Sequence, residues 1–270
     1  MLAFTILGLA TWRSWPHLRF WHRFQPLGPN AQGYPEYRHK ETGLVFVSLP
    51  GGTYWMGAQK DDPNGPHYDP DAEAKEAPVH EVTLSSFLIA KCEVSQAEWE
   101  RVMSTNPSGF KGADFPVESV SWEDYQEFCR KAGLKLPTEA QWEYACRAGS
   151  VDRFCWGDDE SRLGEFAWCN ANSGLKTHAV GQKQPNAFGL HDVHGNVWEW
   201  CEDVYDVGFY SKPEAAGPDP LCTSGSVSRV YRGGSWNSNA ERCRSAVRGV
   251  NRPYFLNSHV GFRPVYYPLP

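Results

Sequence analysis

The densest group of side chains that could do chemistry lies in residues 186–203, which read NAFGLHDVHGNVWEWCED. Asn196 and Glu199 lie at a turn there, and further acidic residues are close in the chain. Oxygen donors closely spaced along an irregular backbone are the ligands that calcium takes, with backbone carbonyls completing the shell. The pattern favours a structural calcium ion held by Asn196 and Glu199. The alternative is that both side chains cap backbone groups.

Motifs of nucleotide-dependent and hydrolytic enzymes are missing from the chain. The Gly-Gly-Ser at residues 233–235 is not followed by the Gly-Lys-Ser/Thr of a P-loop, and no G-x-S-x-G occurs. The His-Glu at residues 80–81 is not part of an H-E-x-x-H motif. His191 and His194 have acidic neighbours, but no third histidine or cysteine is spaced to complete a metal site.

The last third of the chain combines large aromatic residues with arginines. Residues 229–263 hold seven arginines and one acid, a balance of +6, whereas residues 59–81 hold seven acids and two lysines, a balance of −5. These segments are either two solvated faces that attract each other, or the arginine-rich one is a binding surface, because guanidinium groups donate to carboxylates and carbonyls in pairs. Some arginines must also brace the loops. We expect Arg248 to be structural and Arg252 to be more exposed.

The candidate binding surface lies on two C-terminal loops. Large aromatic anchors dominate binding energies at low entropic cost, and polar neighbours add hydrogen bonds. The candidate residues are Trp236, Ser238, Asn239, Glu241, Tyr254, Phe255, Asn257 and His259. The alternative for Tyr254 and Phe255 is that both belong to the core. We expect a protein or peptide ligand there.

Three helices must position these groups, and each is announced by a capping box, in which a Ser or Thr cap is answered three residues later by an acid or amide. The boxes predict helices over residues 95–103, 121–132 and 138–148. Short strands are predicted over residues 43–49, 53–56 and 79–89. Residues 61–77 carry acids and prolines without periodicity, which predicts a long loop, and after Gly149 only short strands and turns are expected.

Composition narrows the class of protein. The chain has 270 residues, of which 41% are hydrophobic and 21% charged, so it can bury a sizeable core. Its 12 Trp, 25 Gly and 20 Pro favour a loop-rich α+β fold over a helical bundle. A net charge of −6 argues against a nucleic-acid partner, because phosphate binding needs clustered Lys and Arg.

The first 33 residues are expected to lie outside the domain. Residues 1–12 are apolar, arginines and aromatic residues follow, and residues 25–33 read as a linker, so we place the domain at 34–270. The apolar start is either a short anchor or a disordered segment, and any membrane association is confined to residues 1–23. The eight cysteines form no C-x-x-C pair, and we expect few or no disulfides, with Cys129 and Cys146 as buried thiols.

Several motifs together carry a family resemblance. They are PGGTYWMGA at residues 50–58, APVHEVTLSSFLIAKCEVSQAEW at 77–99, FPVESVSWEDYQEFC at 115–129 and LPTEAQWEYACRAG at 136–149. NAFGLHDVHGNVWEW, RGGSW, CRSAVR and VGFRPV follow in the same order. Over residues 43–265 the chain resembles the formylglycine-generating enzyme (sulfatase-modifying factor) family. The resemblance implies a variant C-type-lectin-like fold with structural calcium.

The resemblance also implies a chemistry whose residues are only partly present. Catalytic members oxidise a sulfatase cysteine to formylglycine with copper and oxygen, using two cysteines five residues apart shortly after the Gly-Gly-Ser. Aligned forward from that motif, the first position is Ser238 and the second is Cys243, while aligned backward from Arg248, Cys243 matches neither. One thiolate and a hydroxyl hold Cu(I) poorly. The candidate catalytic residues are Cys243 and Ser235.

Three functions remain open from the sequence. The first is a non-oxidase family member that acts as a binding or accessory module. The second is an oxidoreductase that converts a sulfatase cysteine to formylglycine, with copper held by Cys243 and another thiol brought in by the fold. The third is a diversified ligand-binding protein of a diversity-generating retroelement, with its variation in the C-terminal loops at residues 251–259.

Overall fold

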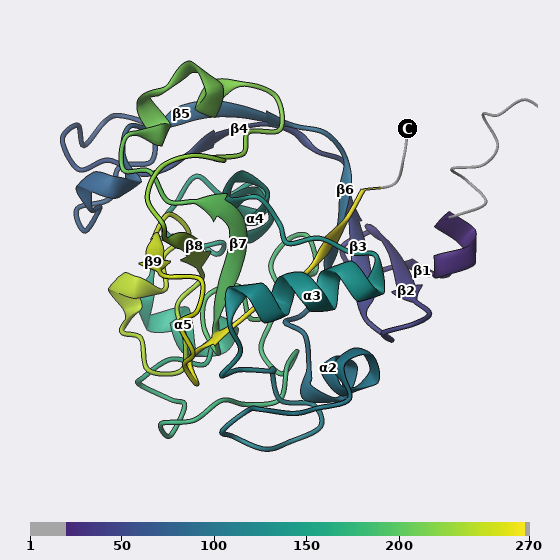
Figure 1. Ribbon diagram of the computed structural model, residues 1–270. Helices are drawn as coiled ribbons and strands as arrows, with labels where there is room; N and C mark the ends of the chain where they lie inside the picture. Colours follow the sequence, from purple (N-terminus) through teal and green to yellow (C-terminus); the bar gives the residue numbers. More distant parts are fainter. Residues whose placement is uncertain (1–19, 268–270) are drawn as a thin grey trace, which may run out of the picture.

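The computed structural model describes residues 20–267 (Figure 1). The strands are β1 (Phe24–Pro29), β2 (Pro35–His39), β3 (Val45–Leu49), β4 (Gly52–Met56), β5 (His80–Leu84), β6 (Phe87–Ala90), β7 (Trp198–Val204), β8 (Arg229–Arg232), β9 (Gly249–Asn251), β10 (Val260–Gly261) and β11 (Val265–Tyr266). The α-helices are α2 (Gln96–Met103), α3 (Trp122–Ala132), α4 (Glu139–Arg147) and α5 (Leu163–Phe166). Short 3₁₀ turns are η2 (Ala74–Glu76), η3 (Glu160–Arg162), η4 (Phe209–Ser211), η5 (Pro213–Ala216) and η6 (Ala240–Arg242).

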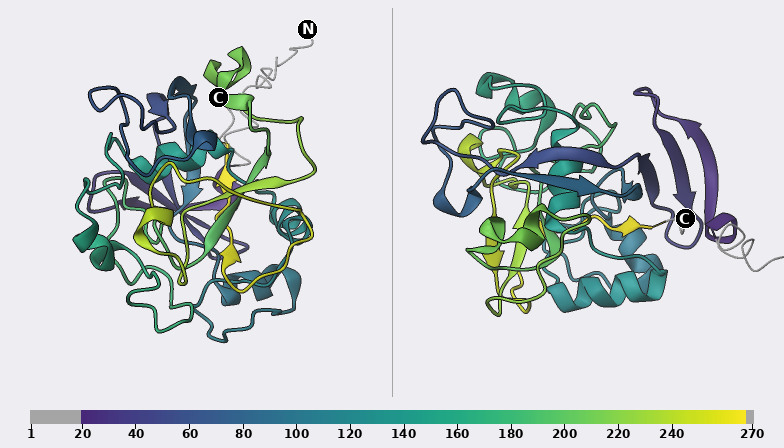
Figure 2. Two further views of the ribbon diagram at one scale, coloured as in Figure 1. Left: turned by 90° about the vertical axis from the view of Figure 1, so that its left-hand side faces the viewer. Right: turned by 90° about the horizontal axis from the view of Figure 1, so that it is seen from above.

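The described strands form three sheets. Their orders are β1-β2-β3-β6-β11, β10-β7-β8-β9 and β4-β5, and the pairs are antiparallel except β10 with β7. Figure 2 shows β1 and β2 at one end of the molecule, whereas the sheet of β7, β8 and β9 lies in its body. The mixed helix and strand content agrees with the predicted α+β class.

All three predicted helices are confirmed, because their signals are local. In each, the cap side chain accepts from the third helical N–H and the answering side chain accepts from the cap N–H, starting at Ser95, Ser121 and Thr138. The last helix ends at Arg147, one residue earlier than predicted. Ala148 takes the left-handed conformation that closes it, with φ +48°.

Two sequence expectations are wrong. Residues 25–33 are not a linker, because Phe24–Pro29 forms β1 and pairs with β2. Pro26 and Pro29 make this segment unlike a typical strand in sequence. Proline is tolerated there because β1 is the edge strand of its sheet. Residues 79–89 are not one strand either: the chain breaks at Ser85, whose N–H donates to Asp219 Oδ1 (2.8 Å), and β5 and β6 enter different sheets.

The core consists of two large aromatic and aliphatic clusters. One packs α3 against α2 and the chain end, with the rings of Trp99 and Phe128 stacked at 5.4 Å between centroids. The other packs Trp142 of α4 against β3, β5 and β6. Cys129 and Cys146 are buried, as predicted, and all eight cysteines are free thiols.

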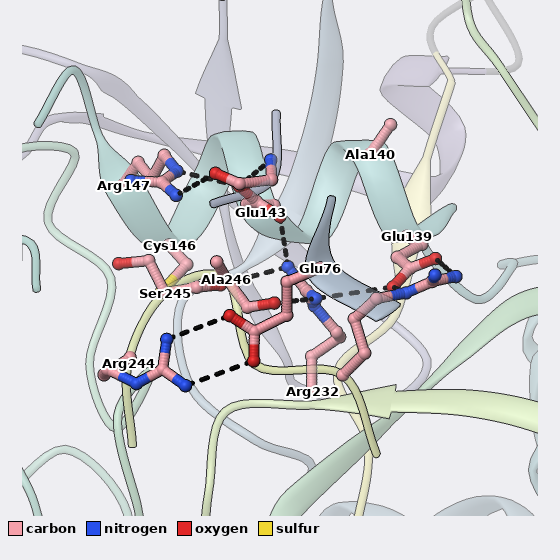
Figure 3. A network of polar contacts seen from close by, with 12 residues as sticks. Glu76, Glu139, Ala140, Glu143, Cys146, Arg147, Arg232, Arg244, Ser245 and Ala246 are labelled. Carbon is pink, nitrogen blue, oxygen red and sulfur yellow. Dashed lines mark hydrogen bonds and ion pairs between the residues drawn. The ribbon is translucent and has the colours of Figure 1, made fainter. Parts of the chain in front are cut away.

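Buried arginines tie the loop-rich half to the helices (Figure 3). Arg244 pairs with Asp69 and Glu76, so the acidic and basic segments do meet, but through buried ion pairs rather than solvated faces. Arg248 is 1% exposed and holds Glu139 with two hydrogen bonds (2.7 and 2.8 Å). Arg252 is exposed. The expectation for both residues is confirmed.

The apolar segment at residues 1–12 lies outside the described residues, so its expected role as an anchor stays a prediction. Within residues 20–267, no helix is both long and apolar enough to cross a bilayer.

Candidate functional site

A cavity of about 620 Å³ opens near the predicted surface, beside the four-stranded sheet. It is lined by η2, the loop after α5, the strands β7 to β9, the chain from residue 237 through η6, and the segment before β10. The lining residues are Lys75, Asn170, Trp198, Tyr231, Asn237, Ser238, Asn239, Arg242, Arg248, Gly249, Val250 and His259. A cavity of this size accommodates a small molecule or a few residues of a peptide.

Register in the sheet builds the aromatic wall of this cavity. Tyr231 on β8 pairs across the sheet with Trp200 and Gly249. Its ring meets Trp198 edge to face, with 5.1 Å between centroids. A Cβ added at Gly249 would lie only 1.9 Å from the Tyr231 ring, so the ring occupies the space that glycine leaves. We therefore assign Gly249 the role of placing Tyr231.

The Gly-Gly-Ser loop brings Ser238 to the cavity. Gly233 and Gly234 take positive φ angles of +102° and +74°, which turn the chain sharply after β8. The Ser235 N–H then donates to Ser238 Oγ (3.0 Å), and the Ser235 hydroxyl donates to Asn237 Oδ1 (2.8 Å). Ser235 is fully buried and used in these contacts, so it holds the loop rather than acting on a ligand.

Cys243 does not line the cavity. Its side chain is fully buried in a cluster with Phe154, Leu163, Ala167 and Cys169. Burial raises the pKa of the Cys243 thiol, which disfavours its thiolate form in this structure.

Ser238 supplies a hydroxyl that is already bonded within its loop. The pair Ser238 and Cys243 therefore does not fit Cu(I), which prefers two thiolates. Cys169 shares the apolar cluster with Cys243, and it is the thiol on which the oxidoreductase hypothesis would have to depend.

Glu199 does not fit a calcium site. The carboxylate is fully buried and accepts two hydrogen bonds from Arg263 (2.6 and 2.7 Å), and Trp142 Nε1 donates to it at 2.7 Å. The guanidinium charge neutralises the carboxylate and its donors occupy the oxygens that a cation would need. Among residues 20–267, no group of three or more His, Cys, Asp or Glu side chains is arranged to hold a metal ion.

The side chain of Asn196 is also fully engaged in hydrogen bonds within the protein. Its amide nitrogen donates to Glu93 Oε2 (2.6 Å), and its carbonyl oxygen accepts the N–H of His178 (2.9 Å). The alternative, a cap for a backbone group, therefore describes Asn196. Glu199 instead anchors Arg263.

The structure divides the predicted binding surface into three groups. Ser238, Asn239 and His259 line the cavity. Trp236 and Asn257 brace the loops: Trp236 Nε1 donates to Ser258 O (3.0 Å), and Asn257 O accepts from Ser119 N–H (3.1 Å).

The third group does not line the cavity. Glu241 is exposed, Tyr254 is 62% exposed, and Phe255 is half-buried against the α3 cluster. The open question of surface or core therefore has a different answer for each of the two aromatic residues.

The sequence did not predict the remaining lining residues as part of a site. In the sequence, Trp198 and Tyr231 are ordinary strand residues. Lys75 lies in the acidic loop, more than 150 positions before Tyr231. The signal that could have drawn attention to Tyr231 is the strand RVYR directly before Gly-Gly-Ser, because residues at a strand end beside a sharp turn often face a site.

Comparison with known proteins decides the family. The model of the sulfatase-modifying factor enzyme 1-like domain matches residues 31–267. The chain belongs to this family.

Curated relatives of this sulfatase-modifying factor domain include formylglycine-generating enzymes. That of Thermomonospora curvata is 29% identical over 305 residues, which cover 87% of this chain and 97% of that enzyme. That of Streptomyces coelicolor is 36% identical over 186 residues, which cover 63% of this chain but only 58% of that enzyme's length. The resemblance drawn from the sequence motifs is confirmed.

Solved structures agree on the fold of the sulfatase-modifying factor domain. Treponema denticola variable protein 1 superposes with a TM-score of 0.73 at 28% identity, covering 85% of this chain and 98% of that one. PvdO from Pseudomonas aeruginosa gives 0.73 at 25% identity, covering 85% and 97%. The variant C-type-lectin-like fold is confirmed.

The two loop aromatics should differ in their effect on stability. We expect Tyr254→Ala to cost about 0.5 kcal/mol of unfolding free energy, as for an exposed residue. Phe255→Ala should cost about 2 kcal/mol of unfolding free energy, because a half-buried Phe contributes about half as much as a fully buried one. Urea denaturation of both variants measures this, and equal losses would contradict the division seen in the structure.

Proposed function

We propose that this protein is a non-oxidase member of the sulfatase-modifying factor family that binds a protein or peptide ligand in the cavity beside β8. The observation that carries the proposal is the position of Ser238. It lines the cavity, and the forward alignment from Gly-Gly-Ser puts the first family cysteine at this position, while Cys243 is buried away from that lining. No cysteine is among the residues that line this cavity.

The cavity wall suits a peptide. Trp198 and Tyr231 offer aromatic faces and edges, which are frequent anchors in binding sites. The amides of Asn170, Asn237 and Asn239 can each donate to and accept from a peptide backbone. Neither feature requires a metal or a redox group.

Selection from a library of phage-displayed random dodecapeptides tests the proposal. Peptides are enriched on the wild-type protein and then measured against Asn239→Trp, which fills the cavity from an exposed position. Asn64→Trp makes the same change in an exposed loop away from the cavity and is the matched control. We expect peptides that bind the wild type and the Asn64→Trp variant but do not bind the Asn239→Trp variant. Enriched peptides that bind all three equally, or none at all, would contradict the proposal.

The oxidase alternative is tested separately. A peptide with the sulfatase motif Cys-x-Pro-x-Arg, incubated with the protein, copper and oxygen, should keep its mass, because Ser238 stands where the forward alignment puts the first family cysteine. Ser238→Cys should raise Cu(I) affinity if the forward alignment holds, whereas Ser108→Cys, at another buried serine, should not. A mass loss corresponding to an aldehyde in place of the thiol, produced by the native protein, would overturn the non-oxidase assignment.

A second candidate is a diversified ligand-binding protein. It is supported by the likeness to Treponema denticola variable protein 1 at 28% identity. This candidate requires a reverse transcriptase gene beside the coding sequence, with a near-copy of the codons for the C-terminal loops. Sequencing the flanking DNA decides, and the absence of such a copy there removes the candidate.

A further inference from the structure

The charges around the cavity are all of one sign. Its lining contains the cations Lys75, Arg242 and Arg248 but no Asp or Glu, and burial lowers the pKa of His259, so that ring is neutral at pH 7. This is unexpected in a chain with a net charge of −6. A cavity lined by one sign of charge concentrates ligands of the opposite sign.

Two of these cations already have partners. Arg248 is buried and holds both oxygens of Glu139 (2.7 and 2.8 Å), so its charge is compensated from behind the cavity wall. Lys75 Nζ lies 2.9 Å from Glu73 Oε2. Neither can give its full charge to a ligand.

Arg242 is different. It is exposed at the end of η6, and among residues 20–267 its guanidinium has no hydrogen-bond or ion-pair partner. Its positive charge reaches the Tyr231 ring of the cavity wall: burial raises the pKa of the Tyr231 phenol, and the charge of Arg242 reduces that increase. Five N–H donors therefore stand unused at the cavity beside Tyr231.

A hydrogen bond from Lys75 and, to a lesser extent, the Arg242 charge lower the pKa of Glu73, but neither Glu73 nor Glu241 forms a hydrogen bond with the Arg242 guanidinium within residues 20–267. Glu73 holds Lys75, and Glu241 accepts from Asn239 Nδ2 at 3.1 Å. Neither acid lines the cavity.

We propose that the cavity selects acidic peptides, with a ligand carboxylate on Arg242 and the adjoining peptide against Tyr231 and Trp198. The planar guanidinium matches a carboxylate with two parallel hydrogen bonds. The asparagine amides of the lining are left for the peptide backbone. This inference rests on the proposed peptide-binding function and names the class of peptide.

Fluorescence polarisation with labelled hexaglutamate, hexaglutamine and hexalysine tests the inference. We expect hexaglutamate to bind about tenfold more tightly than the other two, and its affinity to fall with added salt. Because the protein is acidic overall, such binding cannot come from its net charge.

Matched variants locate the binding. Arg242→Gln should weaken hexaglutamate binding about tenfold. Arg38→Gln, at an exposed arginine on β2 far along the chain, should leave it unchanged. Equal binding of the three peptides, or equal losses in the two variants, would overturn the inference.

The library selection separates this failure from that of the proposed function. Cavity-dependent dodecapeptides that lack acidic residues would overturn the preference for acids and leave peptide binding in place. A selection without any cavity-dependent peptide would remove both.

Discussion

Replacing Arg232 with Met is expected to cost about 4 kcal/mol of unfolding free energy. Arg232 is fully buried, and its guanidinium contacts Glu143, Glu139 (3.3 Å) and two carbonyl oxygens, those of Ser245 (3.0 Å) and Ala246 (2.8 Å) (Figure 3). Met retains much of the side-chain length but no donor. The loss comes from the acceptors that remain buried without their partner.

The expected loss is large because Arg232 neutralises a buried carboxylate that is charged in the native protein. Burial alone would raise the pKa of Glu143, but Arg147 and Arg232 lower it to about 2, so this carboxylate is charged at neutral pH. Without Arg232, Glu143 keeps Arg147 (2.8 Å) and Glu139 keeps Arg248. Each carboxylate then keeps one arginine, but Glu143 Oε2 and the carbonyl oxygens of Ser245 and Ala246 stay buried without the donors that Arg232 gave them.

Denaturation with guanidinium chloride at neutral pH measures the effect. Arg130→Met is the matched control: Arg130 also pairs with a glutamate, Glu127, at 2.7 Å, but both side chains are exposed on α3. Its loss should be much smaller, because water screens the pair and solvates what remains. Similar losses in the two variants would show that burial does not set the cost.

The helices and the overall class could be predicted because their causes are local in sequence. Ser121 and Asp124 make a capping box within one turn of chain, and the structure contains both of its hydrogen bonds. Strand β1 could not be found in this way. Its prolines resemble a linker, and only its pairing with β2 shows that it is a strand.

The site was less predictable, because its residues meet only in the fold. Ser238, Asn239 and His259 were found from the resemblance and from residue type, and they do line the cavity. Glu199 is predicted as a calcium ligand from its neighbours in sequence, whereas in the structure it binds Arg263, which is 64 positions away along the chain. The sequence alone does not distinguish a carboxylate that binds a distant arginine from one that binds a metal cation.

His194 should make the protein acid-sensitive between pH 6.5 and 4. Its Nδ1–H donates to Cys243 O (2.7 Å), and Nε2 accepts the N–H of Cys155 (3.2 Å). A peptide N–H can only donate, so Nε2 must be unprotonated and the ring neutral. Burial lowers the pKa of His194 to about 4, and the positive charge of Arg147 acts in the same direction.

The sign of the effect follows from linkage. An unfolded histidine takes up its proton near pH 6.5, whereas the folded one does so only near pH 4. Stability from the neutral ring is therefore fully present above pH 6.5 and is lost as the pH falls toward 4, by about 3 kcal/mol in total. Asp192 and Asp203 act oppositely, because burial raises their pKa values to about 6 and about 7.

A difference measurement isolates His194 from these buried acids. His194→Asn keeps a donor for Cys243 O but cannot take up a proton. The unfolding free energy of the wild type minus that of this variant should shrink by about 3 kcal/mol between pH 7.5 and pH 4, because only the wild type loses the neutral ring. The same substitution at His22, an exposed histidine, should give a difference that hardly changes over this range. If the difference for His194→Asn is equally constant, the neutral buried imidazole is not what makes the fold sensitive to acid.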